Sequence, residues 1–141
     1  MILCDSNVLI ALVDGHDPLR KRAQTDLVRL SRQPLLVTEP VLSEAIFLLA
    51  NATHRSRLRD LLIDLNFKLA PAIDHATLLR EAFDWLAKYA DHTPDWADAH
   101  LAILSQHFQQ FRVWTYDREF RSIWRRPDGS RIPLVGKTSP E

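Results

Sequence analysis

The opening of the chain constrains the fold most, because an apolar run ends there in an acid. Residues 2–4 are apolar, Asp5 follows them, and a second apolar stretch begins at Val8. So short a run, ended by small polar residues, is typical of a buried strand, with Ser6 or Asn7 capping a helix that starts at Val8. In open α/β sheets, ligands bind outside the carboxyl ends of the strands. The sequence therefore predicts that Asp5 lies at a ligand-binding edge.

Short apolar runs alternate with helical patterns along the chain. Strands are expected at 2–4, 35–38, 67–69 and 112–115, with a weaker fifth at 132–135. Helices are expected at 8–13, 19–30, 41–50, 55–65, 76–89, 96–108 and 118–124. This alternation favours an α/β fold with a central, mostly parallel sheet of four to five strands flanked by helices on both faces. A length of 141 residues fits one domain spanning 1–141.

Composition excludes few partners. The 18 basic and 18 acidic residues give zero net charge, so bulk charge favours no class of partner. No segment has the apolar length needed to cross a bilayer, and the N-terminus lacks a signal-type pattern, so the expected location is the cytoplasm. Cys4, the only cysteine, is expected to be a small core residue.

Arginines are concentrated near the C-terminus. They are Arg112, Arg118, Arg121, Arg125, Arg126 and Arg131. The planar guanidinium suits phosphate oxygens, so this stretch is a candidate contact for a nucleic-acid backbone. A solvated helix face explains the same pattern equally well.

Glu44 stands among apolar residues in the helix expected at 41–50. Its helical neighbours include Val41, Phe47 and Leu48, so it interrupts an apolar stripe. A buried charged glutamate costs free energy unless it is paired or bound to a metal ion. A position at the edge of the stripe, or a pairing with an arginine, is the alternative.

Two further acids open the helix that follows Pro94. Pro94 suits the first helical position and Thr93 its cap, which places Asp95 and Asp98 within the first turn. The helix dipole accounts for one acid there, and we assign that role to Asp95. Asp98 borders the buried stripe of the helix and is the one expected to face a site.

Asp117 follows the strand expected at 112–115 and repeats the arrangement at Asp5, although a simple helix cap explains it as well. In a parallel sheet, both strand-end acids lie on one edge. Carboxylates gathered there raise one another's pKa, and a divalent cation removes that penalty. Oxygen ligands favour Mg²⁺ or Mn²⁺, and no two histidines show the compact spacing of a zinc site.

The spacing of these residues resembles that of the PIN-domain ribonucleases, and most of all their compact, VapC-like toxins from bacteria. The matching motifs are Asp5-Ser6-Asn7, Glu44, Asp98-Ala99-x-Leu101-Ala102 and Thr115-x-Asp117-x-x-Phe120. They occur in the family's order over about the first 120 residues. Asp95 is an additional acid, and the segment after Arg125 matches nothing diagnostic.

The resemblance implies an endoribonuclease dependent on Mg²⁺ or Mn²⁺. Its catalytic and metal-binding acids would be Asp5, Glu44, Asp98 and the more variable Asp117, supported by the polar residues Asn7 and Thr115. Arg118 is expected to contact phosphates of the RNA, and Trp96 and Tyr116 to pack in the core or stack on an unpaired base. The resemblance also implies a homodimer and, in a toxin–antitoxin pair, a small antitoxin that blocks the site.

Two rival functions were weighed against this one. A phosphatase of the haloacid-dehalogenase type also has an early strand-end Asp, but it needs a second Asp two residues later, where this chain has Asn7. A degenerate PIN-like module would bind RNA or protein without cutting, and degeneration should erase acids that remain here. A nuclease that is not a toxin stays open.

Overall fold

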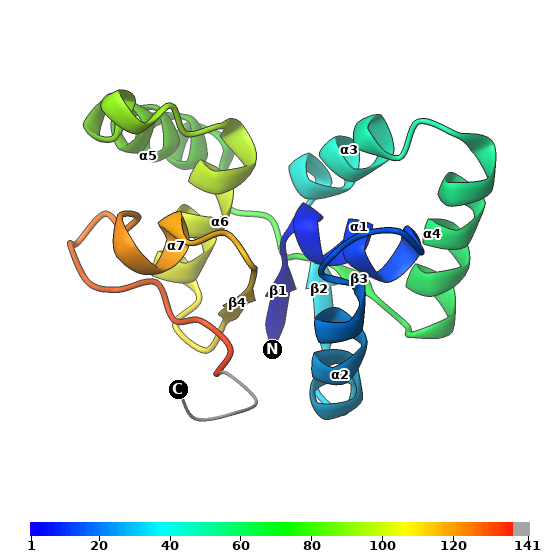
Figure 1. The fold of residues 1–141 in the computed structure, drawn as a ribbon. Helices are drawn as coiled ribbons and strands as arrows, with labels where there is room; N and C mark the ends of the chain where they lie inside the picture. The colour runs from blue at the N-terminus through cyan, green and yellow to red at the C-terminus, as the bar shows by residue number, and fades with distance from the viewer. Residues whose placement is uncertain (137–141) are drawn as a thin grey trace.

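A four-stranded, all-parallel sheet forms the centre of the computed structural model, which describes residues 1–136 (Figure 1). The strands are β1 (Ile2–Cys4), β2 (Leu35–Val37), β3 (Lys68–Leu69) and β4 (Arg112–Trp114), in the order β3-β2-β1-β4. The predicted α/β class with a parallel sheet is confirmed. Because β1 neighbours both β2 and β4, the strand order reverses direction next to β1, which is where ligands bind in such sheets.

Seven α-helices connect the strands within residues 1–136. They are α1 (Ser6–Val13), α2 (Arg20–Leu30), α3 (Glu39–Leu48), α4 (Ala52–Asp64), α5 (His75–Lys88), α6 (Trp96–His107) and α7 (Glu119–Ser122), with a 3₁₀ turn at Ala90–His92. Right-handed crossovers put α1–α4 on one face of the sheet and α5–α6 on the other. The packing agrees, since α1 contacts α2, α3 and α4, and α5 packs on α6.

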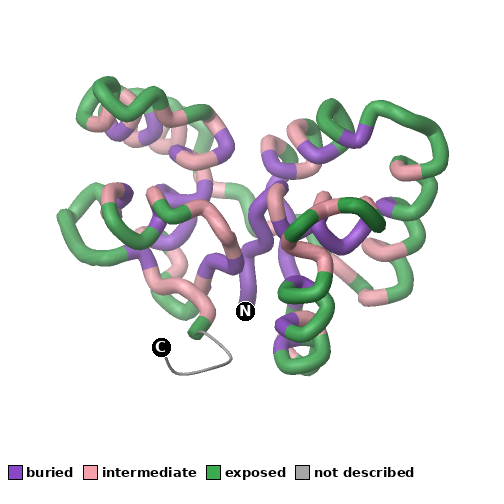
Figure 2. The backbone as a smooth tube through the Cα atoms, viewed as in Figure 1, coloured by how far each residue is buried: buried purple, intermediate pink, exposed green. Residues whose placement is uncertain are grey.

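Burial follows from the position of each strand. Ile2, Leu3 and Cys4 of β1 are fully buried, as expected for an apolar strand covered on both faces and paired on both edges. Figure 2 shows this buried centre with the exposed outer faces of the helices around it. The two residues of edge strand β3 are exposed. The carboxyl end of β1 points toward the side of the molecule where α3 and α5 lie (Figure 1).

Two local predictions at chain turns are wrong. Helix α1 starts at Ser6 rather than Val8, because Asp5 itself is the N-cap and accepts a hydrogen bond from the Ser6 backbone N–H. The weaker fifth strand at 132–135 is reduced to one bridge between Val113 and Leu134. Pro133 lacks the N–H that a longer ladder needs there.

The apolar stripe predicted around Glu44 is not a core stripe. The buried side of α3 and of its C-cap consists of Val41, Ala45 and Leu49, whereas Phe47 is 78% exposed and Leu48 is 56% exposed. Apolar content alone did not reveal which side of the helix meets the sheet. Glu44 is consequently half-buried beside the core.

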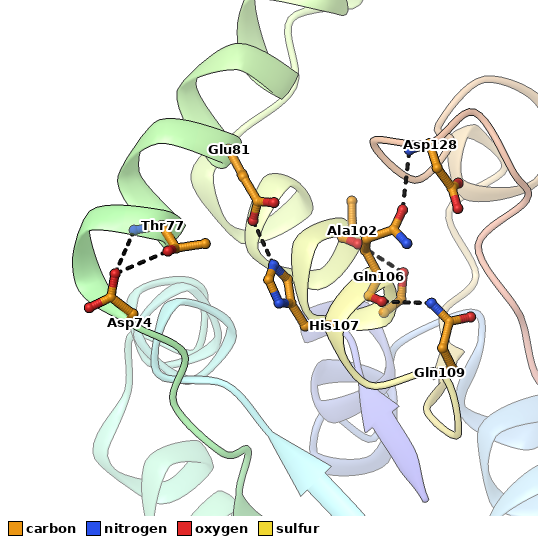
Figure 3. Close-up of polar contacts among 9 residues, drawn as sticks. Asp74, Thr77, Glu81, Ala102, Gln106, His107, Gln109 and Asp128 are labelled. Atoms are coloured by element: carbon orange, nitrogen blue, oxygen red, sulfur yellow. Dashed lines mark hydrogen bonds and ion pairs between the residues drawn. The ribbon is translucent and has the colours of Figure 1, made fainter.

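Polar contacts join α5 to α6 and α6 to the C-terminal segment (Figure 3). Nε2 of His107 lies 2.6 Å from Oε2 of Glu81, and the backbone N–H of Asp128 donates to Oε1 of Gln106 at 3.1 Å. His107 is thereby engaged by a carboxylate of the neighbouring helix. Within residues 1–136, no helix has both the length and the apolar content to cross a membrane.

Candidate active site

Asp5 lies where the central strand turns into α1, and it is only 5% exposed. Its backbone N–H still donates to the carbonyl of Trp114, so the β1–β4 ladder continues up to the acid itself. Its Oδ1 accepts from the Ser6 N–H at 2.8 Å, and its Oδ2 accepts from the Thr115 hydroxyl at 2.8 Å. The carboxylate is thus held in one orientation by donors from two neighbouring strand ends.

Asn7 and Thr115 complete this arrangement. The Asn7 amide donates to Thr115 Oγ1 at 3.2 Å and, at 3.4 Å, to Oδ2 of Asp5. Its own Oδ1 accepts from the Tyr116 N–H at 3.2 Å, and Thr115 Oγ1 accepts from the Asp117 N–H at 3.0 Å. The single hydroxyl proton of Thr115 is donated to Asp5, so the Thr115 oxygen acts as the acceptor for Asn7 and for the Asp117 N–H. Both residues lie where the sequence predicted supporting polar groups.

Glu44 approaches this strand edge from α3. Its Oε1 accepts a short hydrogen bond from the hydroxyl of Ser6, which is itself buried. The sequence analysis treated Ser6 only as a cap and missed this contact. The sequence feature that could have predicted this contact is the small hydroxyl residue directly after the strand-end acid.

Asp95 and Asp98 form a reciprocal capping box at the start of α6. The Asp98 N–H donates to Oδ1 of Asp95 at 2.8 Å, and the Asp95 N–H donates to Oδ2 of Asp98 at 3.2 Å. The predicted cap at Thr93 is therefore wrong. Thr93 adopts a left-handed φ of 48° that ends the preceding 3₁₀ turn, so Pro94 precedes the helix instead of opening it.

Several of the acids lie close enough for their charges to interact. Burial first, and then the neighbouring Glu44 and Asp117, raise the pKa of Asp5 from 3.8 to about 6, against the lowering effect of the hydrogen bonds it accepts. Burial, Asp95 and Asp5 raise the pKa of Asp98 to about 8. Burial also raises the pKa of Glu44, and Asp95 raises it further. We call Asp5, Glu44, Asp95, Asp98 and Asp117 the acidic cluster.

The donor chemistry of the acidic cluster fits a hard divalent cation. No basic side chain within residues 1–136 forms an ion pair with any of its five members, so the protein leaves their charge uncompensated. Carboxylate oxygens are the ligands that Mg²⁺ and Mn²⁺ take. As the side chains stand, no three His, Cys, Asp or Glu groups of the described chain are arranged to share one metal ion. Three of these groups could bind one metal ion only if their side chains rotated.

The residues after β4 line the rim of the cluster. Oδ1 of Asp117 accepts from the Glu119 N–H at 2.9 Å, which fixes the turn into α7. Arg118 is exposed beside it, and only its backbone carbonyl is engaged, by Arg121 and Ser122. The structure thus leaves the guanidinium of Arg118 accessible next to the acids.

The two aromatic residues expected near the acids have different surroundings. The Tyr116 ring is covered by the guanidinium of Arg22 at 4.7 Å, and its hydroxyl donates to Asp26 at 2.7 Å. Trp96 is half-buried and lies against Phe83, with 5.7 Å between ring centroids. One face of Tyr116 is therefore already occupied, whereas Trp96 lies between core and surface.

Comparisons with known proteins agree with the fold described above. The sequence model of the PIN domain matches residues 2–125. Among solved structures, the chain is similar to the crystal structure of Mycobacterium tuberculosis VapC20, described as a sarcin-ricin loop cleaving toxin. The TM-score is 0.70 at 19% identity, over 86% of this chain and 94% of that one, which is a likeness of fold. No curated protein matches the sequence.

Proposed function

The chain belongs to the PIN domain family, a family of nucleases, and on that premise we propose that it is a metal-dependent endoribonuclease. One observation carries the proposal. Asp5, at the carboxyl edge of the parallel sheet, lies close enough to Glu44, Asp98 and Asp117 for the charges to interact, and none of the four acids has a cationic partner among residues 1–136. Such a cluster suits metal-assisted hydrolysis of a phosphodiester, because a cation held by the acids would lie between them and the phosphate, which they otherwise repel.

We propose that these four acids hold Mg²⁺ or Mn²⁺. When bound, the metal supplies an activated water and neutralises charge that develops on the scissile phosphate. The polar side chains around the acids orient them: Asn7 and Thr115 position Asp5, and Ser6 positions Glu44. Such outer partners fix the ligand orientation on which metal affinity depends.

From the sequence, Asp95 was expected only to interact with the dipole of α6. Its contacts with Asp98 and its influence on Glu44 support a role in orienting Asp98. Arg118, exposed at the rim, is proposed to bind a phosphate that flanks the cleaved one.

A role as the toxin of a toxin–antitoxin pair follows by analogy with the solved toxin of similar fold. The exposed apolar side chains of α3 and α5 support protein partners of that kind. They are Ile46, Phe47, Leu48, Leu79 and Phe83. Exposed apolar side chains are common at interaction sites, and we propose that a second copy of the chain and a small antitoxin bind at these two helices.

Cleavage of single-stranded RNA in Mn²⁺ tests the proposed function. We expect Asp5→Asn and Asp98→Asn to lower kcat/KM by at least about 100-fold, because each removes a charged ligand. The matched control is Asp64→Asn, an exposed acid at the end of α4, which should leave the rate unchanged. Metal-independent binding of RNA without cleavage would favour the degenerate binding module instead.

A further inference from the structure

A cavity of about 600 Å³ opens beside the acidic cluster. Its floor is formed by residues that follow two strands, Thr38 after β2 and the segment 69–73 at the end of β3. It therefore lies on the same carboxyl edge of the sheet as Asp5. Its volume is within the range of pockets that enclose small ligands.

The walls of the cavity come from the helices that carry the acids. Ser43 of α3 precedes Glu44, and Trp96 and His100 of α6 lie two residues before and after Asp98. Helices α3 and α6 pack on each other, and Glu44 and Asp95 interact where they meet. The cavity therefore borders the two helices that carry acids of the cluster, on the side of α6 that Trp96 and His100 share.

The chemistry of the lining suits a flat, uncharged ring. Trp96 and Leu78 give it aromatic and aliphatic surface. Neither Lys nor Arg lines it, whereas the acid Glu39 does, which argues against a phosphate. His100 supplies the polar atom: its Nδ1 is buried, and within residues 1–136 nothing hydrogen-bonds to it. A ligand in the cavity that hydrogen-bonds to this ring would satisfy a polar group that the protein leaves without a partner.

We propose that this cavity binds one unpaired nucleobase of the RNA, adjacent to the phosphate that is cleaved. Unpaired bases are recognised in proteins by stacking on aromatic side chains and by hydrogen bonds to their edges, and Trp96 and His100 provide both. An apolar side chain of a protein partner would leave the His100 nitrogen without a partner. The proposal rests on the proposed nuclease function and names a contact that selects its substrate.

The test compares short RNAs that differ only by an abasic ribonucleotide at one position near the cut. For the wild-type chain, removal of the base at one position should lower kcat/KM by about 10-fold, the usual effect of one stacked base. In His100→Phe, and in Ser43→Phe, which fills the cavity from its exposed rim, loss of that base should have little further effect. His107→Phe, on the same helix but paired with Glu81 outside the cavity, should keep the full difference. Thermal unfolding checks that each variant is folded.

Binding separates failure of this proposal from failure of the proposed function. Anisotropy of a fluorescein-labelled heptaribonucleotide is measured in EDTA, where no cleavage occurs. Base-dependent binding that His100→Phe abolishes supports the cavity site, even if the wild-type chain cleaves no RNA. If removal of a base changes neither cleavage nor binding at any position, the proposed base site is wrong. It is also wrong if a cavity variant loses a protein partner while its base preference is unchanged.

Discussion

The two halves of the acidic cluster are built in different ways. At the strand edge, Asp5 is nearly fully buried, yet it accepts hydrogen bonds from Ser6 and Thr115, and its pKa rises only to about 6. At the helix side, Asp98 is less buried, lies against Asp95, and its pKa rises to about 8. Hydrogen-bond donors therefore offset part of the rise in pKa that burial causes at Asp5. The strand edge is organised by these hydrogen-bond donors, and we expect the helix side to depend more on a bound cation for its stability.

The largest expected effect is stabilisation by metal. A ligand at 100 times its Kd adds about 2.7 kcal/mol to the free energy of unfolding, and we expect a rise in Tm of several degrees with Mn²⁺. Asp98→Asn should abolish the rise, because the helix side depends on the cation. Asp64→Asn should keep it. Equal stabilisation of all three proteins would mean that the metal binds elsewhere.

Next in size is the effect of the strand-edge donor. Thr115→Val removes the hydroxyl that holds Oδ2 of Asp5, and we expect kcat/KM to fall about 10- to 100-fold. The NMR-detected pKa of Asp5 should rise at the same time, because a hydrogen bond that lowers it is gone. Thr25→Val is the control, since the hydroxyl of Thr25 only donates to a carbonyl in α2. An unchanged rate would remove Thr115 from the site.

The dependence of stability on pH should also distinguish the two sides. In the metal-free protein, Asp5 and Asp98 have folded pKa values of about 6 and about 8, above the ordinary value of 3.8, so the folded state binds more protons than the unfolded chain. The free energy of unfolding should therefore fall as pH rises from about 4 to 8. Urea unfolding should show Asp98→Asn more stable than wild type at pH 8, and about equal to it near pH 4.

Two exposed aspartates affect the free energy of unfolding only below this pH range. Hydrogen bonds from Thr77 lower the pKa of Asp74, and those from Ser130 lower the pKa of Asp128. Their stabilising effect is lost only as pH falls below about 4. A loss of stability between pH 8 and pH 5 would contradict the assignment of Asp5 and Asp98.

The smallest effect is expected from Asp95→Asn. An asparagine retains the oxygen that caps α6 but removes the charge, so the free energy of unfolding should change by less than about 0.5 kcal/mol. The pKa of Asp98 should fall, because a repelling neighbour is gone. Two-dimensional NMR of the carboxyl carbons measures it. An unchanged Asp98 would show that Asp95 does not act on it.

Local sequence signals predicted most of the fold. The four strands were placed within one residue of their observed ends, because short apolar runs bounded by polar residues are distinctive in a parallel sheet. Helix starts were less accurate: α6 begins at Trp96 as predicted, but α1 begins two residues early because Asp5 is a cap as well as a member of the cluster, and α4 begins at Ala52 rather than 55. An acid at a strand end can both cap the next helix and belong to the cluster, and the sequence alone does not distinguish these two roles.

The sequence by itself determined the α/β class, the order of the elements and the acids that end β1 and β4, because these depend on hydrophobic patterning along a few residues. Only the tertiary structure decided which acids interact, that Ser6 binds Glu44, and that Phe47 faces outward. Those outcomes depend on how α3 and α6 pack at the carboxyl edge of the sheet. That packing joins residues far apart in the chain, and no local pattern encodes it.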